Sequence, residues 1–159
     1  LKIPQEGPML YEFNARYESG AEDGHAGFGI HLFADSSYPR ESWGSGKSYL
    51  FWLNYDENPG NPDIPKGFST QIYQSVSHSR MELVESIDLN GYSYLITREN
   101  LASPLPIKIY MNNKNGEVRV YDPTNPDEYV HFYLDPKAVP ARASWLALRT
   151  NGGKFSFGM

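Results

Sequence analysis

The chain has 159 residues, of which 40% are hydrophobic and 21% are charged, as is typical of one folded domain spanning residues 1–159. Its net charge of −5 disfavours nucleic-acid binding, which needs a basic surface, and it also disfavours attachment to an anionic membrane. No cysteine is present, so disulfides, thiolate zinc sites and cysteine nucleophiles are excluded, and no apolar run approaches the roughly 20 residues of a membrane span.

Short segments of alternating apolar and polar residues, separated by Gly, Pro, Asn and Asp, predict strands rather than helices. In the first part of the chain these segments are residues 10–16, 27–33, 48–55, 68–74, 80–85 and 92–97. Segment 48–55 carries apolar residues on both of its faces. We therefore expect this strand to lie centrally in a sheet that is covered on both sides.

The last third of the chain continues the same pattern in residues 106–111, 117–121, 129–134, 145–150 and 154–158. The dipeptide Asn115-Gly116 predicts a hairpin between the first two of these segments, because both residue types tolerate turn conformations. About ten or eleven short strands without a convincing helix predict an all-β fold. The expected architecture is a two-sheet antiparallel β-sandwich of the jelly-roll kind.

Residues 44–48 (GSGKS) end like a nucleotide-binding phosphate loop. That motif also requires a glycine at position 41, where this chain has Glu41, and a helix after the lysine, where a strand is predicted. The segment is therefore interpreted as a flexible turn that leads into a strand.

A loop rich in oxygen-bearing side chains follows that strand. Asp56, Asn58 and Asp63 are candidate ligands for Ca²⁺, which prefers six to eight oxygen ligands in flexible geometry. The loop lacks the spacing of an EF-hand, and Asp, Asn, Pro and Gly are also the ordinary residues of turns. The four histidines form no close pair, which disfavours a zinc site.

Aromatic side chains are the most informative feature of the sequence, since 12 of the 159 residues are tyrosine. In the last third, tyrosines alternate with inward apolar residues, so they should form an exposed platform together with His131 and Arg119. Tyr38, Trp43, Tyr55 and Tyr73 are expected to form a second cluster. The candidate ligand-binding residues are Trp43, Tyr55, Tyr73, Tyr110, Tyr121, Tyr133, His131 and Arg119. Alternatively, cross-strand tyrosine pairs only stabilise the sheet.

Three stretches resemble the concanavalin A-like lectin/glucanase superfamily, which includes laminin-G-like domains. They are residues 26–34 (AGFGIHLFA), 106–122 (PIKIYMNNKNGEVRVYD) and 143–158 (ASWLALRTNGGKFSFG). The resemblance implies a sandwich that binds carbohydrate or protein, often beside a calcium ion. Hydrolases of this superfamily carry E-x-D-x-x-E on one strand, and residues 82–88 (ELVESID) do not have that spacing.

The sequence thus predicts a non-catalytic module that recognises a glycan or another extracellular polymer through aromatic side chains. We expect an extracellular or periplasmic location, because the composition suits exported β proteins and the chain begins with Leu1 rather than Met. One alternative is an assembly protein of a surface appendage or filament sheath that contacts neighbouring subunits through its tyrosines. Another is a glycoside hydrolase that uses Glu82 or Glu85 with Asp88.

Overall fold

The computed structural model describes residues 1–37, 40, 42–92, 101–123, 125, 127–135, 137 and 145–158. Within these residues the strands are β1 (Pro8–Gly20), β2 (His25–Ala34), β3 (Ser48–Asp56), β4 (Gly67–Ser75), β5 (Met81–Asp88), β6 (Leu105–Asn112), β7 (Glu117–Tyr121), β8 (Tyr129–Tyr133), β9 (Trp145–Asn151) and β10 (Gly153–Gly158). A short 3-10 helix, η1 (Asn90–Tyr92), follows β5. The prediction of a strand over 92–97 is wrong at Tyr92, which belongs to η1, and residues 93–97 lie outside the described part.

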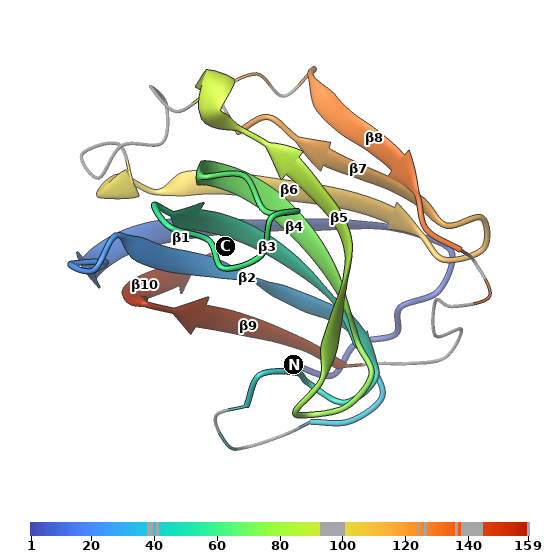
Figure 1. Cartoon of the computed structure of the whole chain (residues 1–159). Helices are drawn as coiled ribbons and strands as arrows, with labels where there is room; N and C mark the ends of the chain where they lie inside the picture. Colours follow the sequence, from blue (N-terminus) through green and yellow to red (C-terminus); the bar gives the residue numbers. More distant parts are fainter. Residues whose placement is uncertain are drawn as a thin grey trace.

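The strands form two five-stranded antiparallel sheets that pack against each other (Figure 1). Sheet A has the order β5-β4-β3-β2-β9, and sheet B has the order β10-β1-β6-β7-β8. This arrangement confirms the predicted β-sandwich. Strand β3 is the middle strand of sheet A, and Leu50 and Trp52 on its outer side are 2% and 6% exposed. The expectation of a central strand that is buried on both faces is therefore confirmed.

The two sheets meet along one side of the sandwich, where the chain passes twice from one sheet to the other. Strand β1 leads into β2, and β9 leads into β10, so Gly20 and Gly153 pair at this corner. The backbone N–H of Ala21 donates to the Gly152 carbonyl over 2.8 Å. Strands β5 and β8 are the free edges at the other ends of the two sheets (Figure 1).

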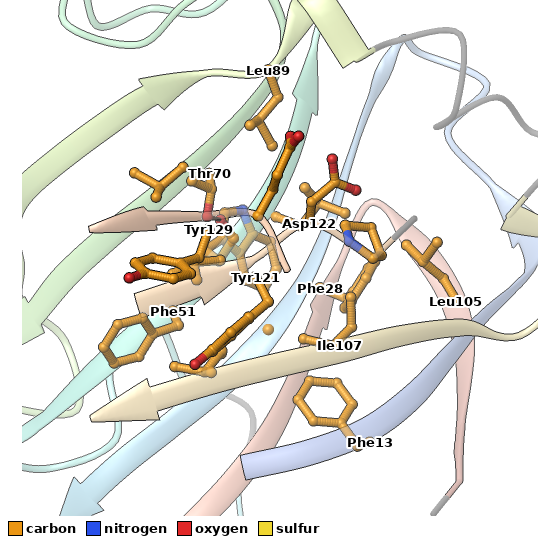
Figure 2. A pocket seen from close by; sticks show the side chains of 18 of the residues that line it. Phe13, Phe28, Phe51, Thr70, Leu89, Leu105, Ile107, Tyr121, Asp122 and Tyr129 are labelled. Atoms are coloured by element: carbon orange, nitrogen blue, oxygen red, sulfur yellow. Dashed lines mark hydrogen bonds between the residues drawn. The ribbon is translucent and has the colours of Figure 1, made fainter. Parts of the chain in front are cut away.

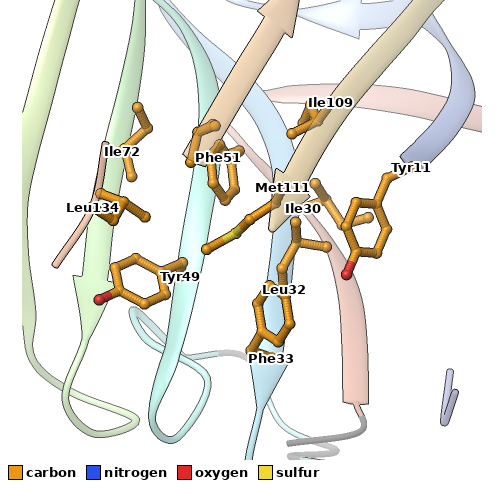
Figure 3. Packing of buried hydrophobic residues seen from close by; sticks show 11 residues of the cluster. Tyr11, Ile30, Leu32, Phe33, Tyr49, Phe51, Ile72, Ile109, Met111 and Leu134 are labelled. Carbon is orange, nitrogen blue, oxygen red and sulfur yellow. The ribbon is translucent and has the colours of Figure 1, made fainter. Parts of the chain in front are cut away.

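The larger core cluster lies between the sheets and is built from the inward residues of both (Figure 3). Leu32, Tyr49 and Ile72 of sheet A face Met111 and Val118 of sheet B, and all five are at most 2% exposed. Alternation along each strand produces this arrangement, because every second side chain points into the same layer.

A buried glutamine that the sequence did not single out connects the N-terminal segment to three strands. The Gln5 side-chain oxygen accepts hydrogen bonds from the Tyr11 hydroxyl and the Phe33 backbone N–H, each over 3.0 Å. Its side-chain nitrogen donates to the Trp145 carbonyl, also over 3.0 Å. Gln5 is 2% exposed, so these three bonds satisfy a polar group that would otherwise be costly to bury.

The β6–β7 hairpin forms at the predicted Asn-Gly position. Gly116 has a φ of +76°, and its N–H donates to the Asn112 carbonyl over 2.8 Å. Its own carbonyl accepts from the N–H of Leu134 over 2.8 Å, so the turn also holds the end of β8. Among the described residues Asn115 does not share the positive φ, so Gly116 alone supplies the left-handed conformation.

Candidate functional site

The outer side of sheet B carries most of the predicted ligand-binding residues, and this surface is named the tyrosine face. Its members are Tyr110 on β6, Glu117, Arg119 and Tyr121 on β7, and Tyr129, His131 and Tyr133 on β8. The strand register sets Tyr110, Arg119 and His131 side by side across three strands. The sequence prediction that Tyr110, Arg119, Tyr121, His131 and Tyr133 share one surface is confirmed, and Glu117 is an addition that the sequence analysis did not name.

Four rings of the tyrosine face form a continuous row along the edge of the sheet. The centroid of Tyr121 is 5.3 Å from that of Tyr129, which is 6.1 Å from His131, and His131 is 5.0 Å from Tyr133. Tyr129 and Tyr133 are 44% and 65% exposed. The row therefore offers ring surfaces to a ligand while neighbouring rings support one another.

Arg119 lies at the centre of this face between two tyrosine rings. Its guanidinium carbon is 5.0 Å from the Tyr110 centroid and 5.1 Å from the Tyr129 centroid. Its Nε donates to the Glu117 carboxylate over 2.9 Å, and His131 Nε2 lies 3.3 Å from the same carboxylate. The hydrogen bond from Arg119 lowers the pKa of Glu117 and raises the pKa of Arg119. These contacts hold Arg119 in place before any ligand arrives.

A second aromatic group lies on the outer side of sheet A. Trp43 and Tyr73 have centroids 6.3 Å apart, and the Arg149 guanidinium is 4.7 Å from the Trp43 ring and 5.8 Å from the Trp52 ring. Arg149 also donates to the backbone carbonyls of Ser42 and Trp43. Trp43 is 46% exposed, whereas Trp52 is buried. Arg149 and Trp52 were not predicted here, because neither their spacing nor their residue types set them apart in the sequence.

The predicted second cluster is divided in the structure. Tyr55 lies at the far end of β3 from Trp43 and packs against Phe68, with centroids 4.7 Å apart. Its hydroxyl donates to Glu57 over 2.6 Å. The expectation that Tyr55 lies beside Trp43 and Tyr73 is wrong, because odd-numbered residues of β3 face the other sheet. Tyr38 lies outside the described residues.

The candidate calcium loop uses its oxygens in local turns. Asp56 Oδ1 accepts from the Asn58 backbone N–H over 2.9 Å, and Asn61 Oδ1 accepts from the Asp63 N–H over 3.0 Å. Among the described residues no group of three or more His, Asp or Glu side chains could hold a metal ion. Calcium binding by Asp56, Asn58 and Asp63 stays a prediction.

The three carboxylates proposed for hydrolysis lie on the edge strand β5 and are exposed. Glu82 pairs with Arg80 over 2.5 Å, and Asp88 Oδ1 accepts from the Asn90 N–H over 2.7 Å. Glu82, Glu85 and Asp88 are also absent from the described lining of the cavity between the sheets.

That cavity is a feature the sequence did not predict. It lies between the two sheets, has a volume of about 480 Å³ and is surrounded mainly by inward apolar side chains (Figure 2). Alternating strands predict a filled sandwich core, and nothing in the pattern indicates where the inward side chains leave a space.

No family model, no curated protein and no solved structure matches this chain. The resemblance to the concanavalin A-like superfamily consequently stays a prediction. In the described part of the chain no helix has the length and hydrophobicity that crossing a membrane would require.

Proposed function

We propose that this protein is a non-catalytic carbohydrate-binding module whose binding surface is the tyrosine face of sheet B. The observation that carries the proposal is the continuous row of Tyr121, Tyr129, His131 and Tyr133, of which two tyrosines are substantially exposed. Pyranose rings present apolar C–H surfaces, and these stack on aromatic rings that are already ordered.

Polar groups beside the rings support the same proposal. Arg119 and Glu117 offer a fixed donor and a fixed acceptor next to the ring row, and Lys108 lies 4.8 Å from the Tyr121 ring. Sugar hydroxyls need both donors and acceptors, so this mixture suits an uncharged or weakly charged glycan. The proposed location is outside the cytoplasm, where such polymers are found.

The test is binding to a panel of soluble polysaccharides, measured by affinity electrophoresis and calorimetry with calcium and with a chelator. Tyr133→Ala should weaken binding about tenfold, because it removes an exposed stacking ring and leaves the core unchanged. Tyr133 is 65% exposed, so the unfolding free energy should not change measurably.

Val84→Ala is the matched control, since Val84 is 44% exposed on β5 of the other sheet. It should bind glycans like the native protein. An equal loss of glycan affinity in Tyr133→Ala and Val84→Ala would contradict the proposal. Failure of the native protein to bind any polysaccharide would also contradict it. If the chelator weakens glycan binding by the native protein but not by Asp56→Asn, that result would support the calcium prediction.

The assembly alternative has one observation in its favour. Leu10 on β1 is 47% exposed and pairs in register with Tyr110, so an apolar side chain extends the tyrosine face across the sheet. Surfaces of this composition also bind proteins. Concentration-dependent self-association that Leu10→Ser abolishes, in a protein that binds no glycan, would favour a subunit of an assembly over a lectin-like module.

A further inference from the structure

The inward side of the sandwich is incompletely packed at one end. Phe13, Leu53, Ile107, Val120 and Val130 all occupy inward strand positions, yet each is only partly buried. In the other half of the sandwich the corresponding positions are almost fully buried. Facing sheets normally bury such residues against each other, so these five side chains border a space that protein atoms do not fill.

That space is the cavity of about 480 Å³ shown in Figure 2, where Phe13 and Ile107 of sheet B and Phe51 and Thr70 of sheet A surround it. Its volume lies within the range of about 300–1,000 Å³ that small-molecule sites occupy. The Thr70 hydroxyl donates to the Trp52 carbonyl, so this inward polar group already has a partner. The interior thus suits an apolar body without hydrogen-bonding groups.

The edge of the cavity is acidic. Asp122, Asp127 and Glu128 line it, Asp127 and Glu128 are exposed, and the described lining contains no lysine or arginine. The backbone N–H of Asp122 donates to the Glu128 carbonyl, and the N–H of Glu128 donates to the Asn125 carbonyl. The acidic side chains therefore stand at the solvent end of an apolar space.

Two basic residues in the described part of the chain, Lys108 and Arg119, each contact a carboxylate other than Asp127 and Glu128. Lys108 stacks on the outer side of Tyr121 and lies 3.8 Å from Glu12, and Arg119 is paired with Glu117. Both cations are thus engaged with carboxylates outside the cavity. A ligand with a positive end would be attracted to the acidic edge, and a ligand with a carboxylate would be repelled.

We propose that the cavity between the two sheets binds a small apolar molecule that carries a cationic amine at one end. The apolar body lies between Phe13, Phe51 and Ile107, and the amine lies at the solvent end beside Asp127 and Glu128. This site adjoins the proposed glycan surface, because Tyr121 and Tyr129 also line the cavity, whereas Tyr133 and His131 are absent from its described lining.

The first experiment measures the binding of Nile red to the full chain. Nile red is a neutral apolar dye whose emission shifts to shorter wavelength in apolar surroundings. Decylamine, decanol and decanoate, each below its micellar concentration, then compete with the dye. Decylamine should displace Nile red at the lowest concentration, and decanoate should require the highest. Absence of a dye shift, or equal competition by decanoate and decylamine, would overturn the proposal.

Two sets of variants locate the site. Val130→Phe narrows the cavity and should weaken Nile red binding about tenfold, whereas Val84→Phe, the same change on an exposed position, should not. Asp127→Asn with Glu128→Gln should keep Nile red affinity and reduce the preference for decylamine over decanoate about fivefold.

Circular dichroism and urea unfolding establish that each variant is folded. Asp63→Asn, at an exposed acid in another loop, is the charge control. Unchanged dye affinity in a folded Val130→Phe, or an unchanged amine preference in the double variant, would contradict this assignment. Tyr133→Ala should leave dye binding intact, so failure of the glycan proposal and failure of this one are distinguishable.

Discussion

Gly116→Ala is expected to lower the free energy of unfolding by about 3 kcal/mol, the largest stability loss predicted here for a single methyl group. Gly116 has a φ of +76°, a conformation that costs an L-residue about 1 kcal/mol or more. A Cβ atom there would lie 1.9 Å from the Leu134 carbonyl oxygen, so the end of β8 must also move. Leu134 is 4% exposed and belongs to the core, which makes that movement costly.

Urea unfolding measures this loss of unfolding free energy in Gly116→Ala, with Gly60→Ala as the control. A Cβ at Gly60 meets no atom within 4 Å, and Gly60 has no left-handed φ, so its replacement should change stability little. The Gly116 variant should also bind glycan more weakly, because β8 carries Tyr129, His131 and Tyr133. A loss below about 1 kcal/mol would show that the hairpin adjusts without disturbing β8.

Acid is expected to destabilise the protein through His31. Burial, together with the positive charge of Arg149, lowers the pKa of this histidine from 6.5 to about 4. His31 is 3% exposed, and its Nδ1 lies 3.0 Å from the Ser48 hydroxyl. The folded protein therefore keeps His31 neutral at pH values where the unfolded chain binds a proton.

The pH range follows from these two pKa values. Above pH 6.5 His31 is neutral in both states and has no effect, whereas between 6.5 and 4 protonation favours the unfolded chain. The free energy of unfolding should therefore fall by about 3 kcal/mol as the pH is lowered through this range.

Denaturant unfolding at a series of pH values, with His31→Asn for comparison, isolates this contribution. Asparagine can still pair with Ser48 but does not titrate, so the variant should be less stable at neutral pH and lose less stability on acidification. Carboxylates titrate in both proteins and cancel in the comparison. Parallel pH profiles would show that His31 does not cause the acid sensitivity.

Local pattern was sufficient to predict the strands and much of the tyrosine face. Residues 106–111 and 117–121 alternate regularly and are joined at Asn115-Gly116, so both the hairpin and the outward side of Tyr110 and Arg119 could be predicted. On a strand the side of a residue depends only on its position in the alternation, which any reader of the sequence can count.

Contacts between distant segments could not be predicted in the same way. Arg149 reaches the Trp43 ring across more than a hundred residues, and Gln5 bonds to the backbone of Trp145. Tyr55 was grouped with Trp43 and Tyr73, but in the structure it packs against Phe68, whereas Trp43 contacts Tyr73. Such pairings depend on which strands become neighbours, and no local period encodes that order.

The sequence by itself determined that the protein is a β-sandwich and which tyrosines point outward, because both follow from the two-residue period of strands. Tertiary structure alone decided that Tyr121, Tyr129, His131 and Tyr133 form one row, and that the inward residues of the two sheets leave a cavity beside Asp127 and Glu128. Strand order and the packing of inward side chains from both sheets set these features, and both depend on the fold of the whole chain.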